Sequence, residues 1–392
     1  MRETDVAIVG AGLAGSLAAT MLGRAGYSVA LIDPLEQARP DFRCEKIEDR
    51  HADSLGKAGV LDEILPAARR YENVWVARLG RLAEIKPIVE YGIAYGDFVN
   101  AIRRLVPPNV GLVKNKVTGI ALTPDRQILT LAGGEQVSAR LVVGAIGLGA
   151  GLLERIGMHR REISRCHSLS IGFDAEAASP PFDSLTYFGE DPAYRIAYIT
   201  LFPLATGLRV NLFTYHELDD RWVHKLRTDP ADVIAEALPR LERLIGRLRV
   251  RGGIKIRPVD LIATENVMQP GIVLIGDAFS TACPVSGTGA SKALVDAERL
   301  CNIYVPNWLS TAGMDTDKIA AFYRDPVKCR CDAHSLRSSL FSRRSALGET
   351  ALWSAYRWGC YAGSLGRNLI EHGHFPRLPS GYPVLNETPL NS

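Results

Sequence analysis

In the first 33 residues, two short apolar runs flank a segment whose apolar residues recur with helical spacing. This order is typical of a strand, a helix and a second strand. Residues 5–9 and 28–32 are short apolar runs that predict buried strands. Residues 13–25 have the period of a helix, and Gly26 predicts its end. Together these elements predict a β-α-β unit, in which a helix joins two parallel strands.

The rest of the chain changes its pattern twice. Residues 110–146 are rich in strands, and the continuously apolar residues 141–146 predict a strand in the centre of the first sheet. After about residue 160, apolar runs predict a separate sheet, before a buried-strand pattern returns at residues 272–275. The expected helices are residues 45–70, 95–105, 230–247 and 316–370, and the expected strands of the separate sheet are residues 169–173, 185–188, 196–202 and 208–215. We therefore expect a second domain inserted into the first.

The composition is that of an ordinary globular protein. Of the 392 residues, 47% are hydrophobic and 23% are charged, which excludes a disordered chain, a collagen and a coiled coil. The net charge is only +3 and no basic tail is present, so we expect no nucleic-acid partner. Residues 6–23 carry no charge, but their glycines and the acidic residues before them favour a strand, turn and helix over a membrane span. We expect a soluble protein without integral membrane contact.

The cysteines predict a reducing compartment. None of the seven forms a Cys-x-x-Cys pair, and the neighbours Cys329 and Cys331 lack a second ligand pair nearby. Such cysteines are typical of buried or free thiols, so we expect a cytoplasmic protein and no metal site. The seven are Cys44, Cys166, Cys283, Cys301, Cys329, Cys331 and Cys360.

A glycine motif lies between the first strand and the first helix. Residues 10–15 read Gly-Ala-Gly-Leu-Ala-Gly and fit G-x-G-x-x-G. Gly10 permits a tight turn, Gly12 lets a pyrophosphate approach the backbone, and Gly15 packs the helix on the strand. The helix then presents unpaired N–H groups to phosphates, and Asp33, 18 residues after Gly15, can accept hydrogen bonds from an adenosine ribose. The predicted dinucleotide site comprises Gly10, Ala11, Gly12, Leu13, Ala14, Gly15 and Asp33.

A second glycine cluster lies far downstream. A buried strand ends at Gly276-Asp277, and a later turn opens another helix near Ala290. A second helix N-terminus would suit a delocalised anion, such as the N1–C2=O2 edge of a reduced flavin. By itself the cluster is equally compatible with an ordinary strand-to-helix turn. Its residues are Gly276, Asp277, Pro284, Gly287, Thr288, Gly289 and Ala290.

Together the two clusters resemble the FAD-dependent aromatic hydroxylases, the para-hydroxybenzoate hydroxylase-like flavoprotein monooxygenases. The resemblance covers about residues 4–345 and includes residues 141–147. It implies that Asp277 binds the flavin ribityl chain and that residues 287–290 lie beside the flavin ring. The implied fold is α/β, a Rossmann-like FAD-binding domain with an inserted β-sheet substrate domain and a helical C-terminal region. The expected boundaries are residues 1–160 and 262–320, 161–261, and 321–392, respectively.

Three positions depart from the usual pattern of this family. Ile146 stands where the family has an acid linked to FAD and NAD(P)H binding, and Ser280 stands where a histidine commonly follows Gly-Asp. Tyr95 stands where an arginine often begins a helix that helps to position the FAD. FAD binding is compatible with all three changes. From Ile146 in place of the acid, we expect free NAD(P)H to reduce the bound flavin slowly in the absence of substrate. The alternative is that the protein uses another reductant.

The resemblance implies a monooxygenase that hydroxylates an aromatic or similar electron-rich ring. It would use FAD, NADH or NADPH, and O2, through a flavin C4a-hydroperoxide. An FAD-dependent reductase or cyclase of the geranylgeranyl-reductase type remains open, as does an inactive FAD-binding scaffold or redox sensor. A flavin-dependent halogenase shares the fold, but its Trp-x-Trp-x-Ile-Pro signature is absent from this sequence. The expected partners are O2 and a small aromatic or cyclic substrate, with a homodimer left open.

The substrate residues are harder to read from the sequence. Tyr198, Arg209 and Tyr215 lie on strands of the expected inserted sheet, where alternate side chains would point into a cavity. Arg209 can clamp a carboxylate or stabilise a phenolate, and a tyrosine hydroxyl can relay the phenol proton. The alternative is a surface arginine–acid pair and two core or rim tyrosines. These three residues are the candidate catalytic residues.

Aromatic residues also gather near the end of the chain, as Trp353, Tyr356, Trp358 and Tyr361. Their spacing is compatible with a helix docking surface, which the sequence favours, or with a stripe at a membrane interface.

Overall fold

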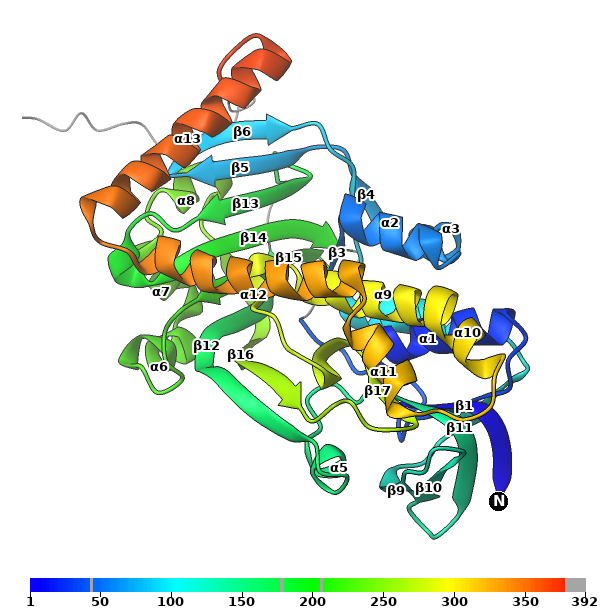
Figure 1. Ribbon diagram of the computed structural model, residues 1–392. Helices are drawn as coiled ribbons and strands as arrows, with labels where there is room; N and C mark the ends of the chain where they lie inside the picture. The colour runs from blue at the N-terminus through cyan, green and yellow to red at the C-terminus, as the bar shows by residue number, and fades with distance from the viewer. Residues whose placement is uncertain (43–44, 177–179, 205–206, 378–392) are drawn as a thin grey trace, which may run out of the picture. The chain divides into compact units, whose positions relative to one another are not determined.

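The computed structural model of the protein describes residues 1–42, 45–176, 180–204 and 207–377 (Figure 1), so Cys44 lies outside the described residues. The chain divides into two compact units. Unit 1 comprises residues 1–68, 93–165 and 260–338, and unit 2 comprises residues 69–92, 166–259 and the chain from residue 339 onward. Three elements begin in one unit and end in the other, namely β12 (His159–Glu176), β16 (Arg249–Glu265) and α12 (Pro326–Leu347).

Unit 1 is built on a mixed sheet of seven strands. Its order is β8-β2-β1-β11-β10-β9, and β17 pairs with the remaining side of β11. Strands β1, β2, β8, β11 and β17 are parallel, whereas β10 pairs in antiparallel fashion with both β11 and β9. The apolar runs that predicted buried strands lie at its centre, because β1 pairs with both β2 and β11. The bounds are β1 (Arg2–Val9), β2 (Val29–Ile32), β8 (Val110–Val113), β9 (Val117–Ala121), β10 (Gln127–Leu131), β11 (Gln136–Gly144) and β17 (Ile272–Leu274).

Helices cover this sheet, and α1 packs against α9 (Figure 1). Helix α4 also packs against α1. The helix expected at residues 45–70 is broken into shorter pieces, because Gly59 adopts φ +68° after α2 and Pro66 lies in a 3₁₀ turn. The bounds are α1 (Leu13–Arg24), β3 (Lys46–Ile47), α2 (Asp49–Lys57), α3 (Leu61–Ile64), η1 (Leu65–Ala67), α4 (Tyr95–Arg104), α5 (Gly151–Glu154), η3 (Gly276–Ala278), η4 (Pro284–Ser286), α9 (Gly289–Arg299), the π-helix η5 (Leu300–Tyr304), α10 (Val305–Leu309) and α11 (Thr316–Tyr323).

Unit 2 is built on a second sheet of seven strands, in the order β16-β12-β15-β14-β13-β5-β6. One face packs an apolar cluster of residues such as Leu201, Val210 and Leu212 against Val223 and Val233 of two helices. The opposite face carries polar and aromatic side chains. The bounds are β4 (Arg69–Tyr71), β5 (Val74–Arg78), β6 (Arg81–Lys86), β7 (Glu90–Gly92), β13 (Ser184–Phe188), η2 (Pro192–Tyr194), β14 (Ile196–Leu204), β15 (Gly207–Thr214), α6 (Arg221–Thr228), α7 (Pro230–Ala237), α8 (Leu241–Ile245) and α13 (Ala351–His372).

The units differ from the domain boundaries expected from sequence. Residues 69–92 belong to unit 2, because β5 pairs in parallel with β13 and extends the second sheet. The expected C-terminal region is divided between the units, since α13 packs along β6 of unit 2 (Figure 1). Both features depend on contacts between distant residues. Within the described residues, no helix is both long and apolar enough to cross a membrane.

Candidate functional site

The first glycine motif forms a tight turn between β1 and α1. Gly10 adopts φ +101°, and a Cβ there would lie 2.5 Å from the carbonyl oxygen of Ala145. A Cβ on Gly15 would lie 1.9 Å from the carbonyl oxygen of Gly10, so the helix can approach the turn only without a side chain. Around Gly12, by contrast, nothing lies within 4 Å of the Cβ position. The motif therefore packs closely at its two ends and leaves open space in the middle.

The N-terminus of α1 can accept an anion. Gly12 is the N-cap residue, no side chain caps the helix, and no acidic residue lies in the first turn. The first N–H groups of a helix have no partner inside the helix, and they lie at the positive end of its dipole. Open space above Gly12 and an uncapped helix end are the features that a pyrophosphate requires, so this turn fits the diphosphate of FAD.

Asp33 and Arg103 hold this turn from two sides. Asp33 accepts a hydrogen bond from the Ala11 N–H at 2.7 Å and a second from the Leu35 N–H at 2.7 Å. The Nε of Arg103, in the last turn of α4, donates to the Ala11 carbonyl at 2.8 Å. Burial lowers the pKa of Arg103, although the nearby Asp33 carboxylate partly offsets this, and a guanidinium stays charged. Arg103 was not among the residues predicted from the sequence, although it is a basic residue in the last turn of an expected helix.

A cavity of about 430 Å³ opens beside Asp33. Its walls come from the ends of β1 and β2, from the β8–β9 connection and from the segment after β11. Ile146, which stands at the position of the family's usual acid, is one of the lining residues. An acid at the edge of a cavity next to a phosphate-binding turn fits the adenosine half of FAD. Other lining residues are Gly10, Pro34, Asn115, Lys116, Thr118, Leu152 and Arg155.

The second glycine cluster meets the first at Gly276. This residue adopts φ +61°, and a Cβ there would lie 3.5 Å from the side chains of both Ala14 in α1 and Ala293 in α9. The meeting follows from the sheet order, because β17 pairs with β11, which itself pairs with β1. The two clusters are more than 250 residues apart in sequence, and unit 1 brings them together.

The turn that precedes α9 is held by hydroxyl groups and an arginine. Gly287 adopts φ +64°, and its carbonyl accepts a hydrogen bond from Arg50 of α2 at 3.0 Å. The hydroxyl of Thr288 lies 2.7 Å from that of Ser286 and 2.6 Å from that of Ser335 in α12. Helix α9 then begins at Gly289 without a side-chain cap or an acidic first turn, so Gly289 and Ala290 offer a second anion-binding helix end.

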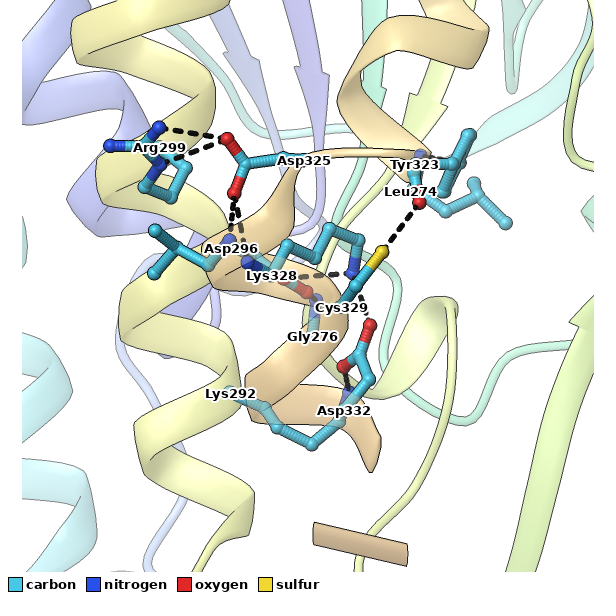
Figure 2. A network of polar contacts seen from close by, with 11 residues as sticks. Leu274, Gly276, Lys292, Asp296, Arg299, Tyr323, Asp325, Lys328, Cys329 and Asp332 are labelled. Carbon is cyan, nitrogen blue, oxygen red and sulfur yellow. Dashed lines mark hydrogen bonds and ion pairs between the residues drawn. The ribbon is translucent and has the colours of Figure 1, made fainter. Parts of the chain in front are cut away.

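A network of buried charges connects α12 to both parts of this cluster, as Figure 2 shows. Asp296 of α9 accepts a hydrogen bond from the Gly276 N–H at 2.8 Å and another from the Lys328 ammonium at 2.9 Å. The same ammonium donates to Asp332 at 3.0 Å, and Asp332 also pairs with Lys292 in α9. Lys328, Asp296 and Lys292 are all buried. Two lysines and two carboxylates thus fix the Gly276 turn and the start of α9 to one helix.

The charges in this network support one another. Burial lowers the pKa of Lys328, but the carboxylates of Asp296 and Asp332 more than offset it, so the pKa lies above its ordinary value. The ammonium is also 4.0 Å from the ring centroid of Phe279, within reach of a cation–π contact. Asp325 caps the start of α12 and accepts a hydrogen bond from Arg299 at 2.8 Å. Removing one member would leave a buried charge without compensation.

Asp277 follows directly in this turn and lies near a cation. Burial lowers the pKa of Arg160, and the charge of Asp277 raises it in part. The Nη2 of Arg160 donates to the Gly147 carbonyl at 2.7 Å. A carboxylate in this turn can accept hydrogen bonds from a polyol chain.

The candidate substrate residues lie in unit 2. Register places Tyr198 and Arg209 on the same face of the sheet, opposite the apolar cluster. Arg209 is almost fully buried, and its Nε lies 3.3 Å from Oδ1 of Asp174. The Tyr198 ring packs at 4.9 Å from that of Phe213 and at 5.7 Å from that of Phe188. Arg209 therefore has an acidic partner, but the pair is not a surface pair.

Tyr215 lies just after β15 and is fully buried. Its ring packs edge-to-face at 6.1 Å from that of His167, and the guanidinium of Arg343 lies 5.7 Å from the ring. Arg343 also donates to the His167 carbonyl at 2.8 Å. The surroundings of Tyr215 are thus side chains of unit 2, whereas Tyr198 and Arg209 share one broad sheet face.

Comparisons with known proteins agree with this geometry. A family described as FAD binding domain matches residues 3–87. The chain is 26% identical to 3-demethoxyubiquinol 3-hydroxylase of Escherichia coli (strain K12) over 325 residues, which are 78% of this chain and 80% of that protein. It is 23% identical to 6-hydroxynicotinate 3-monooxygenase of Bordetella bronchiseptica over 76% of this chain and 82% of that protein.

The fold is also that of a solved monooxygenase. The structure of p-nitrophenol 4-monooxygenase PnpA from Pseudomonas putida DLL-E4 superposes with a TM-score of 0.74 at 18% sequence identity, covering 95% of this chain and 97% of that one. The two glycine turns, the acid after β2 and the relatives agree on one cofactor, FAD, with NAD(P)H as the usual reductant of such enzymes. The chain is similar to the FAD-dependent aromatic hydroxylases over most of its length and is an FAD-dependent monooxygenase.

Proposed function

We propose that this enzyme hydroxylates an aromatic or similarly electron-rich ring, with O2 and NAD(P)H as co-substrates. FAD, when bound, supplies the electron transfer and oxygen activation that amino-acid side chains cannot provide. The protein has to hold the cofactor, orient the ring, exclude water and stabilise developing charge.

We propose specific residues for holding FAD. Residues 10–15 would bind the diphosphate through the uncapped start of α1, and Asp33 would accept hydrogen bonds from the adenosine ribose. Asp277 would bind the ribityl chain. Residues 287–290 would lie beside the flavin ring, where the start of α9 can stabilise negative charge on its pyrimidine edge. Pro284 and Gly276 would shape the approach to this second turn.

The face of the unit 2 sheet that carries Tyr198 and Arg209 is the observation that supports a ring substrate. Aromatic rings lie next to one another across three strands there, at Phe188, Tyr198 and Phe213. Close by on the same face lies the buried cation Arg209. Aromatic side chains pack well on a flat ring, and a buried guanidinium can stabilise a phenolate or a carboxylate. An electron-rich phenolate would favour attack on an electrophilic oxygen.

The experiment is an 18O2 incubation of the FAD-loaded enzyme with NADH or NADPH and a panel of phenols and hydroxypyridines. Mass spectrometry should find one 18O atom in a ring product. Arg209→Ala should lower affinity or hydroxylation by about 10- to 100-fold, the effect of losing a charged hydrogen bond, at unchanged FAD content. Arg209→Lys should recover part of the loss.

The matched control is Arg247→Ala, since Arg247 forms an exposed ion pair with Asp232 in the same unit. It should leave turnover unchanged. If no compound gains 18O, while the reduced enzyme saturates an alkene under anaerobic conditions, the reductase interpretation replaces the hydroxylase.

A further inference from the structure

Helix α13 buries two polar side chains and exposes several large apolar ones, the reverse of an ordinary surface helix. Only Ser364 and Asn368 of its 22 residues are buried. On other sides of the helix, Leu352 is 75% exposed, Trp358 is 54% exposed and Ile370 is 85% exposed. Trp353 and Leu365 are half-buried, but the fully buried side chains of the helix are polar.

Polar contacts to β6 fix the orientation. Arg367 forms two hydrogen bonds with the Glu84 carboxylate, each 2.9 Å long. The Asn368 side chain accepts a hydrogen bond from the Ile85 N–H at 2.8 Å, and Nε2 of His372 lies 2.8 Å from the Ile85 carbonyl oxygen. The Glu84 side chain is buried, so its pairing with Arg367 cannot be given up without cost. The helix cannot simply rotate its apolar residues inward.

The exposed apolar surface continues beyond the helix at both ends. Before it, Phe341 at the end of α12 is exposed and packs against the rings of Trp353 and Tyr356, at 5.7 and 5.4 Å. After it, Phe375 is exposed. A helix of 22 residues is about 33 Å long. The exposed apolar surface therefore extends far beyond one isolated apolar residue. Contiguous apolar surfaces of this kind mark interaction sites.

The charge around this surface indicates which partner it fits. Residues 339–377 contain five arginines and two glutamates. Arg367 pairs with Glu84 and Arg343 lies 3.9 Å from Glu217, so three arginines remain against Glu349 and Glu371, an excess of one positive charge. Arg344 and Arg377 are exposed near the two ends of the surface. A second copy would bring like charges together, whereas an anionic lipid surface would attract them. Tryptophan and tyrosine side chains are also typical of the boundary between headgroups and acyl chains.

We propose that α13 docks the protein on the surface of an anionic lipid bilayer. The helix would lie in the plane of the interface, with Leu352, Trp358 and Ile370 among the headgroups and upper acyl chains, and the arginines near lipid phosphates. The contacts of α13 with β6 in unit 2 fix the helix in this orientation in the absence of lipid. Docking is independent of the hydroxylation proposed above, so either can fail while the other stands.

The test is co-sedimentation of the FAD-loaded protein with vesicles of phosphatidylcholine alone or mixed with phosphatidylglycerol. The wild type should bind the mixed vesicles, and more weakly at high salt. Ile370→Asp should reduce binding at least tenfold, because a charge replaces an inserted apolar side chain. Arg344→Gln and Arg377→Gln should each reduce binding to the mixed vesicles by about fivefold.

The matched control is Leu112→Asp, at a residue of β8 in unit 1 that is 68% exposed and outside this surface. It should bind like the wild type, and all variants should keep their FAD. The proposal is overturned if the wild type binds neither kind of vesicle, or if Ile370→Asp and Leu112→Asp behave alike. A dimer in light scattering that Ile370→Asp dissociates, without vesicle binding, would assign the surface to a second copy instead.

Discussion

The two glycine turns of unit 1 are held in different ways. The first, at residues 10–15, is fixed by its own backbone, by Asp33 and by Arg103. The second, at residues 276 and 287–289, depends on buried charges of α9 and α12, with Lys328 at their centre. Both turns lead to an uncapped helix. The first turn is thus held by hydrogen bonds to its backbone, and the second by a network of buried charges.

The difference predicts different responses to mutation. The first turn should lose cofactor affinity when a ligand-facing residue changes, with little change in stability. The second should lose stability first, because its support is a set of charges that are costly to bury alone.

The largest effect should follow Lys328→Met. The variant leaves Asp296 buried without its ammonium partner, which should lower the free energy of unfolding by about 3–5 kcal/mol. Urea unfolding and the FAD content of the purified protein measure this. A double variant with Asp296→Asn should regain part of the stability, because it removes both charges. Lys57→Met, at an exposed pair with Asp53, should match the wild type. An unchanged unfolding free energy in Lys328→Met would show that the network does not support the second turn.

Asp33→Ala should weaken FAD binding with a smaller effect on folding. A hydrogen bond to a charged acceptor contributes roughly 1.5–3 kcal/mol, so the dissociation constant should rise about 10- to 100-fold. Quenching of FAD fluorescence on titration with apoprotein measures it. The control Asp53→Ala changes an exposed carboxylate on α2 and should leave affinity unchanged. Wild-type affinity in Asp33→Ala would remove this residue from the cofactor site.

Gly12→Ala and Gly289→Ala compare the two turns directly. Neither change meets a close protein atom, since nothing lies within 4 Å of the Cβ position at Gly12 and only the Ala282 side chain, at 3.9 Å, at Gly289. A methyl group facing a bound cofactor should cost about 1–3 kcal/mol of affinity. Isothermal titration with FAD measures it, and Gly56→Ala in α2, where nothing lies within 4 Å, is the control. A loss at Gly12 alone would mean that the second turn does not approach FAD.

The last prediction concerns pH and His51, which follows Arg50 in α2. Burial lowers the pKa of His51 from 6.5 to about 4. The unfolded chain therefore binds a proton that the folded protein excludes, and stability should fall as the pH decreases from about 6.5 to about 4, by at most about 1.4 kcal/mol per pH unit. Unfolding at several pH values should show a shallower slope for His51→Gln. The exposed His224→Gln is the control, and equal slopes in all three proteins would contradict this account.

The sequence predicted those parts of the candidate site whose residues are close together along the chain. Gly10, Gly12 and Gly15 have the spacing of a strand-turn-helix motif, and their Cβ positions in the fold show why two are crowded and one is open. Arg103 and Lys328 were missed, because their contacts to Ala11 and Asp296 span 92 and 32 residues and leave no periodic signal. The predicted roles of Tyr198, Arg209 and Tyr215 stay predictions.

The sequence by itself determined the β-α-β start of unit 1, the two glycine turns and the existence of a second sheet, because strand alternation, helix period and glycine spacing are local properties. Tertiary structure decided which segments join each unit. Residues 69–92 enter unit 2 because β5 pairs with β13, and α13 turns its apolar residues outward because Glu84 and Ile85 bind its polar ones. These contacts join residues that are far apart along the chain, and such residues come close only when the chain folds.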